Sequence, residues 1–317
     1  MAVELDLAAI LAGAIIVAIL VASAVLWIVN LQRDQHKFAC AAVVPAWPIG
    51  WINFGIFICV LVTSVVIVQL FAAELIHLMN PIEATVIANE VELESTVDLI
   101  SNVDTPAIDR PALTPRMAVM AVLLLQLPLL GTFCALRRFY PKQFAGRLNS
   151  LHLTLWQSFT LAIPQFIRYL PIIWIVSFVW SKLLTELQQF GIIDEFPPQE
   201  LIKLFTNGGD PWAITLLAVI AIVLAPIVEE LIFRGGIYRF LKSQSTVLLA
   251  QIISSALFAT MHSNLMSFLP LVVVGIILAR VYERSGSILV PMCFHACFNG
   301  FSLLMLLIMS QSSLTTN

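Results

Sequence analysis

Long apolar runs dominate the chain and are separated by shorter polar segments. A helix needs roughly 17–25 predominantly apolar residues to cross a bilayer. Eight runs have about this length: 8–30, 43–73, 117–136, 162–184, 212–233, 246–262, 266–282 and 288–310. Most are apolar on all faces, and none alternates with the period of two that a β-barrel strand requires. The pattern predicts an all-α, polytopic membrane helix bundle of about eight transmembrane helices.

The amino-acid composition agrees with a membrane location. Hydrophobic residues make up 60% of the 317 residues and charged residues 11%, whereas about 25% of a typical soluble domain is charged. Lys and Arg gather in every second connection, after the first, third, fifth and seventh runs, and the other connections are acidic. By the positive-inside rule, the basic connections face the cytoplasm and both ends of the chain lie on the other side.

One polar segment, residues 80–116, divides the chain into two unequal parts. It is rich in proline and acidic residues. We therefore predict four regions: an N-terminal transmembrane helix pair over 1–79, an acidic extracytoplasmic loop over 80–116, a six-helix membrane block over 117–310, and a tail over 311–317. No internal repeat relates the parts, which gives no support to a transporter built from duplicated halves.

Two adjacent carboxylates, Glu229 and Glu230, lie in an otherwise apolar run. An ionisable side chain at membrane depth is costly and marks a functional-site hypothesis. Glu230 and Arg234 are i,i+4 neighbours on one helix face, so we expect them to pair. Glu229 lies about 100° around the helix and has no local cation. It is therefore the better candidate for a group that takes a proton from water and later returns it.

Two further polar groups lie in the later runs. Phe258 and His262 are four residues apart, and so are His295 and Asn299. On a helix, the members of each pair share one face, and His295 and Asn299 could hold one small object between them. Because unpaired polar groups are penalised in lipid, we expect these side chains to face the glutamates inside the bundle.

Each group also has a structural interpretation. A Glu–Arg pair taken alone is equally well explained as a link within the bundle, and a single histidine on a helix is more often a core residue than a catalyst. His295 and Asn299 can join helices by hydrogen bonds, as polar residues in membranes do. Arg168, another intramembrane cation, either extends toward the interface or pairs with an acid. The joint occurrence of the three groups, in this order and spacing, favours an active site.

The three motifs resemble those of the CPBP family. They are Glu-Glu-x-x-x-Arg at 229–234, Phe-x-x-x-His at 258–262 and His-x-x-x-Asn at 295–299. The family includes the type II CAAX prenyl endopeptidases and the bacterial bacteriocin-processing and immunity proteins, also described as Abi-like. The resemblance covers about residues 150–305 and leaves the first 116 residues unmatched.

The resemblance implies an intramembrane endopeptidase that hydrolyses a peptide bond of a membrane-associated protein or peptide. By this resemblance, Glu229 would activate the hydrolytic water and His262 would help to orient it. His295 and Asn299 would stabilise the oxyanion, a role worth about 10²–10³ in rate per donor. Structural support would come from Glu230, Arg234 and Phe258. A multi-pass protein of a bacterial inner membrane, with the lipid bilayer and a peptide substrate as partners and no nucleic acid, is the corresponding expectation.

No cofactor is expected, although zinc stays an alternative. If a metal were bound, its ligands would be Glu229, His262 and His295, with one open position. The chain lacks a His-Glu-x-x-His sequence, which is the usual helical zinc motif of metalloproteases. The asparagine that follows the second histidine fits a metal-free, glutamate-dependent mechanism.

Two other functions remain open at this point. A member of the same family can act without catalysis, as a membrane immunity, chaperone or scaffold protein. A proton-coupled transporter would also use a buried carboxylate, although the absence of a repeat lowers its prior probability.

Overall fold

The computed structural model describes residues 7–34, 44–79, 114–144, 147–193, 204–205 and 209–315. These residues form helices and connections, with no strand among them. The helices are α1 (Leu7–Asp34), α2 (Trp51–Met79), α4 (Pro115–Phe139), α5 (Pro141–Phe144), α6 (Leu155–Gln189), α8 (Pro211–Val219), η1 (Ile220–Leu224), α9 (Ala225–Glu230), η2 (Leu231–Tyr238), α10 (Arg239–Gln244), α11 (Val247–Thr260), α12 (Leu265–Ser285) and α13 (Leu289–Thr315). The predicted acidic loop lies outside the described residues, except for its last three positions, of which Thr114 caps α4 and the other two begin it.

The predicted polytopic membrane bundle is confirmed. Within the described part of the chain, seven helices are long and apolar enough to cross a membrane. One of them, Pro211–Gln244, is a continuous rod made of α8, η1, α9, η2 and α10. The sixth predicted run instead forms α11, which has 14 residues. At ~1.5 Å per residue it is about 21 Å long, short of the roughly 30 Å of the hydrocarbon core.

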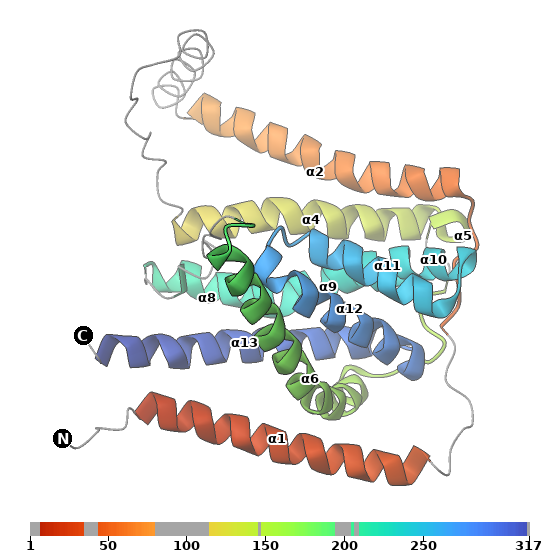
Figure 1. The fold of residues 1–317 in the computed structure, drawn as a ribbon. Coiled ribbons are helices and arrows are strands. Elements are labelled where there is room, and N and C mark those ends of the chain that lie inside the picture. The colour runs from red at the N-terminus through yellow and green to blue at the C-terminus, as the bar shows by residue number, and fades with distance from the viewer. Residues whose placement is uncertain are drawn as a thin grey trace, which may run out of the picture.

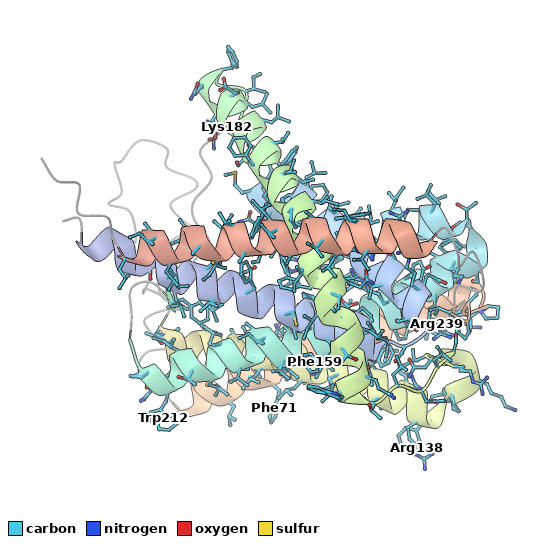
Figure 2. All side chains as sticks on the ribbon, turned by 90° about the horizontal axis from the view of Figure 1, so that it is seen from below. Phe71, Arg138, Phe159, Lys182, Trp212 and Arg239 are labelled. Carbon is cyan, nitrogen blue, oxygen red and sulfur yellow. The ribbon has the colours of Figure 1, made fainter. Side chains whose placement is uncertain are left out.

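The first two helices lie on opposite sides of the molecule (Figure 1). α1 packs against α6 and α13, whereas α2 packs against α4 and α5. The α8–α10 rod, α11 and α12 lie between these outer layers. The start of α1 and the end of α13 are at the same end of the bundle. At the opposite end, Figure 2 shows Arg138 and Arg239, as expected if basic helix ends share one side of the membrane.

The α8–α10 rod changes its winding on both sides of the glutamates. Two π-helical segments, η1 and η2, flank the short α9 that carries Glu229 and Glu230. In η1 the backbone N–H of Ala225 donates to the carbonyl of Ile220, five residues back. Pro226 follows at once and has no N–H to donate, which explains why regular winding is lost here. Segments of this kind often occur at functional sites because they redirect side chains.

α11 and α12 form a tight hairpin that turns at residues 261–264. Ser263 adopts a left-handed backbone conformation with φ of 48°, and the side chain of Asn264 caps α12 by accepting from the Ser267 N–H. The two helices touch at Gly275, where an added Cβ would lie 2.7 Å from the Cβ of Ser255. Both ends of the hairpin lie near basic segments and α11 is short, so we expect the turn to lie at membrane depth. The turn carries His262, which is half-buried and contacts the ring of Phe258.

Candidate active site

Arg234 and Glu230 form the core of the site. They make the ion pair that their spacing predicts, with Arg234 Nη1 2.8 Å from Glu230 Oε1. Arg234 Nη2 also donates to the carbonyl of Gly275 at 3.1 Å, and the guanidinium lies 4.6 Å from the centre of the Phe258 ring. Both charged side chains are buried, with at most 1% exposed. A buried pair of this kind is held by full satisfaction of its donors, so it fixes α9 and η2 against α11 and α12.

His295 lies between the two glutamates. Its Nδ1 is 3.0 Å from Glu230 Oε1, and its Nε2 is 3.7 Å from Glu229 Oε2. Since the Glu230 carboxylate accepts hydrogen bonds, the proton on Nδ1 points at Glu230. This contact leaves Nε2 directed at Glu229. The ring is buried and its other neighbour is Phe258, whose ring centre is 5.7 Å away.

Glu229 differs from Glu230 in its exposure, since the side chain of Glu230 is fully buried. The side chain of Glu229 is 20% exposed, yet its Oε2 is buried and makes no hydrogen bond. The cluster thus sets two carboxylates, one guanidinium and one imidazole side by side, and Glu229 is the acid that faces both the imidazole and the outside of the cluster.

His262 contacts the same Phe258 ring. The two ring centres are 4.8 Å apart, and His262 Nδ1 is 2.9 Å from the Phe258 carbonyl. A carbonyl only accepts, so this bond assigns the proton of a neutral His262 to Nδ1 and leaves Nε2 as an acceptor. Phe258 thus contacts both histidines: its carbonyl binds His262 Nδ1, and its ring packs against both imidazole rings.

Asn299 contacts the broken part of the α8–α10 rod. Its Nδ2 donates to the carbonyl of Ala221 at 2.8 Å. In the five-residue hydrogen-bond pattern of η1, this carbonyl would be served by residue 226, which is a proline and has no N–H. The side chain of Asn299 therefore satisfies a carbonyl that the helix break leaves free. His295 and Asn299 share a helix face but do not hold a common partner.

The structure brings five of the seven predicted site residues into one cluster and places the other two beside it. Glu229, Glu230, Arg234, His295 and Phe258 form one contiguous cluster. His262 reaches it through Phe258, and Asn299 lies next to it along α13. Across the described residues, no three His, Cys, Asp or Glu side chains are placed to hold a metal ion together. The alternative ligand set is therefore not assembled in this structure, and we derive no step through a metal.

Gln126 is a buried polar residue that sequence reasoning missed. Its side chain is buried on α4, and its Oε1 has no hydrogen-bond partner. Gln126 precedes Phe133 by two helical turns on the same face, and the Phe133 ring lies against Gly235 in η2. α4 and the rod run in the same direction (Figure 1), so Gln126 lies at about the depth of Glu229. An amide inside an apolar run of α4 was the signal that could have identified it.

Together, the helical membrane bundle and its buried Glu–Arg–His cluster define a polytopic membrane protein with a polar site inside the bundle. The comparison with protein families agrees with this class. Residues 211–301 match the family described as type II CAAX prenyl endopeptidase Rce1-like. The resemblance of the three motifs to the CPBP family is therefore confirmed over this segment, which contains all seven residues assigned to the site.

Two curated bacterial proteins are similar to part of the chain. One, from Bacillus subtilis, is named "Putative membrane peptidase YdiL" and is 33% identical over 93 residues, 29% of this chain and 38% of that protein. The other, from Escherichia coli, is named "Uncharacterized 24.3 kDa protein" and is 36% identical over 100 residues, 30% of this chain and 46% of that protein. The chain thus spans less than half the length of either relative. No solved structure matches it.

Proposed function

We propose that this protein is an intramembrane endopeptidase that hydrolyses a peptide bond of a membrane-associated protein or peptide with a glutamate-activated water. The observation that carries the proposal is the difference between Glu229 and Glu230. Glu230 is fully buried and its Oε1 is engaged by Arg234 and His295, whereas Glu229 is 20% exposed, makes no hydrogen bond through Oε2, and lies 3.7 Å from His295 Nε2. A carboxylate in this position can bind a water and accept its proton.

The arrangement of the cluster supports a division of roles. Glu229 acts as the base, and His295 Nε2, which is directed at the same space, acts on the carbonyl oxygen of the substrate. A water gives its proton to Glu229, and its oxygen attacks the carbonyl carbon of the scissile bond. His295 then stabilises the oxyanion of the tetrahedral intermediate. Glu229 returns the proton to the leaving nitrogen as the C–N bond breaks, which yields a carboxyl group and an amine.

The remaining residues assist these steps. His262 Nε2, left as an acceptor by the Nδ1 contact with Phe258, is suited to orient the water. Asn299 uses one N–H to hold Ala221, and its second N–H is available to the oxyanion. We place Arg234, Glu230 and Phe258 in supporting positions, since they fix His295 and the glutamate helix.

Comparative proteomics of membrane fractions tests the proposal. Cells that carry the wild-type chain are compared with cells that carry Glu229→Gln, and with cells that carry Glu186→Gln, which removes an exposed carboxylate on α6. We expect an uncleaved membrane-associated species to accumulate only with Glu229→Gln. Identical peptide profiles in all three, together with full biological rescue by Glu229→Gln, would instead support the non-catalytic immunity, chaperone or scaffold function.

A further inference from the structure

Arg168 on α6 is a buried cation outside the candidate active site. The residue is 4% exposed, and its guanidinium lies 5.1 Å from the centre of the Trp27 ring and 5.7 Å from that of Tyr169. Its Nε is buried and has no hydrogen-bond partner. Among the described residues, no carboxylate pairs with it. Since an uncompensated cation is costly at membrane depth, the side chain is suited to an anion that comes from outside the chain.

The backbone holds this cation in place. The carbonyl of Arg168 accepts from Ser23 Oγ at 3.0 Å and from Trp27 Nε1 at 3.2 Å, both on α1. These bonds fix α1 across α6 and bring the Trp27 ring close to the guanidinium. Figure 2 shows the crossing of the two helices between the labelled Phe159 and Lys182. The position of the cation is therefore built by two helices and not left to a flexible side chain.

The aromatic residues beside Arg168 indicate a position near the level of lipid headgroups. Trp27 lies two residues before the end of the apolar span Leu7–Val29, and its ring packs edge-on against that of Tyr169, with the ring centres 5.9 Å apart. Trp and Tyr are enriched at this level because their rings are amphipathic. A phosphate at the membrane surface is thus within reach of the guanidinium, which matches phosphate oxygens with two parallel N–H groups.

An apolar groove begins two residues beyond Arg168 along α6. It lies between α1, α6 and α13, and its volume is about 510 Å³, within the roughly 300–1,000 Å³ typical of small-molecule sites. Apart from two serines, its walls are apolar, and they include Ile16, Leu170, Trp174, Phe301 and Met305. Such a groove suits a hydrocarbon chain.

We propose that the α1–α6 crossing and this groove bind one anionic phospholipid. Its phosphate contacts the guanidinium of Arg168, and one acyl chain lies in the groove. Charge complementarity selects the anionic headgroup, because no carboxylate neutralises Arg168 from within the protein. On α13, Phe301 and Met305 lie roughly a third of a turn from His295 and Asn299. The lipid site is therefore separate from the candidate active site and does not depend on the proposed peptidase function.

Fluorescence quenching by brominated lipids tests this site, because Trp174 lines the groove. The full chain is reconstituted in phosphatidylcholine vesicles in which one lipid in five is either phosphatidylglycerol or phosphatidylcholine with brominated acyl chains. The difference between the wild type and Trp174→Phe isolates the Trp174 signal. We expect an about fivefold preference for the brominated phosphatidylglycerol, the size of one cation's attraction to anionic lipid.

Three variants make the result specific. Arg168→Gln should abolish the headgroup preference, and Lys182→Gln, which removes an exposed cation from the same helix, should retain it. Ser302→Phe fills the groove from an exposed position of its wall and should lower quenching by both lipids while Arg168 stays intact. Equal quenching by the two lipids in the wild type, or a preference that survives Arg168→Gln, would overturn the proposal.

Discussion

Two buried arginines, Arg234 and Arg168, lie in different regions of the bundle and have different partners. Arg234 pairs with Glu230, donates to the Gly275 carbonyl and stacks on Phe258. Arg168 has aromatic neighbours on α1 and α6 but no acid among the described residues. Because a cation in the membrane must be compensated, the first arginine is neutralised by the protein and the second depends on its surroundings.

This difference separates structural from binding uses of an intramembrane charge. Around Arg234, the charged groups are paired within the protein, and Glu229 is the carboxylate of this cluster with access from outside, at 20% exposed against 0% for Glu230. Around Arg168, the group that lacks a partner is the cation itself, since its Nε makes no hydrogen bond. We therefore expect substitutions of Arg234 to act on stability in every environment, and substitutions of Arg168 to act mainly through lipid composition.

The largest effect is expected for Arg234→Met. This change leaves Glu230 buried without its cation, which costs about 3–5 kcal/mol in the free energy of unfolding. Thermal or SDS-induced unfolding of the purified protein measures the loss. The matched control is Arg116→Met, whose side chain is 81% exposed in its pair with Asp210, and which should leave stability at neutral pH nearly unchanged. Wild-type stability of Arg234→Met would contradict this pairing.

The hairpin that supports Arg234 gives a second prediction. In Gly275→Ala, the new Cβ would lie 2.7 Å from the Cβ and 3.0 Å from the Cα of Ser255. Because α11 and α12 would have to separate, we expect a loss of about 1–3 kcal/mol. Gly131→Ala on α4 is the control, since a Cβ there meets nothing within 4 Å. Equal stability of the two variants, measured by the same unfolding assay, would contradict the close packing.

A smaller effect is expected at Asn299. Asn299→Ala removes the bond to the Ala221 carbonyl and should cost about 0.6 kcal/mol, the average for side-chain hydrogen bonds in membranes. Pro226→Ala restores a backbone N–H, so in that background Asn299→Ala should cost less. A double-mutant cycle on unfolding free energies measures this coupling. If the effects of Asn299→Ala and Pro226→Ala on the unfolding free energy were strictly additive, Asn299 would not compensate for the N–H that Pro226 lacks.

The smallest effect is expected for Arg168→Met in phosphatidylcholine. The loss of contacts with Trp27 and Tyr169, about 0.5–2 kcal/mol, is offset because a buried cation no longer has to be desolvated. We expect a net change in unfolding free energy close to zero, well below that of Arg234→Met. A loss as large as that of Arg234→Met would show that the protein itself compensates Arg168, and would remove the contrast between the two arginines.

The sequence predicted the elements that depend on local spacing. The pairing of Glu230 with Arg234 follows from their separation by one helical turn, and the membrane bundle follows from the apolar runs. The sequence also left Glu229 without a local cation, which agrees with its free Oε2. His295 was expected near the glutamates only because polar groups in lipid must find partners, and its position between two carboxylates was not predicted.

The features that the sequence did not predict depend on contacts between segments that are far apart in the chain. Run 246–262 has the length of a span, yet α11 ends at Thr260 because residues 262–264 are polar and Asn264 caps the next helix. The triplet His262-Ser263-Asn264 was the available signal for that turn. The π-helical segments and the Asn299–Ala221 bond could not be predicted, since they depend on how α13 packs on the rod. Arg168 was expected to extend to the interface or to pair with an acid, and among the described residues it pairs with no acid.

The different roles of the two adjacent glutamates are the central claim, and one matched measurement tests it most directly. Glu229→Gln and Glu230→Gln are compared for turnover of a cleaved peptide in proteoliposomes and for unfolding free energy. We expect Glu229→Gln to lose about 10²–10⁴-fold in turnover, as for the loss of a general base, with stability close to that of the wild type. Glu230→Gln should mainly lose stability, because Arg234 is left without its carboxylate. Wild-type turnover by Glu229→Gln would contradict the account.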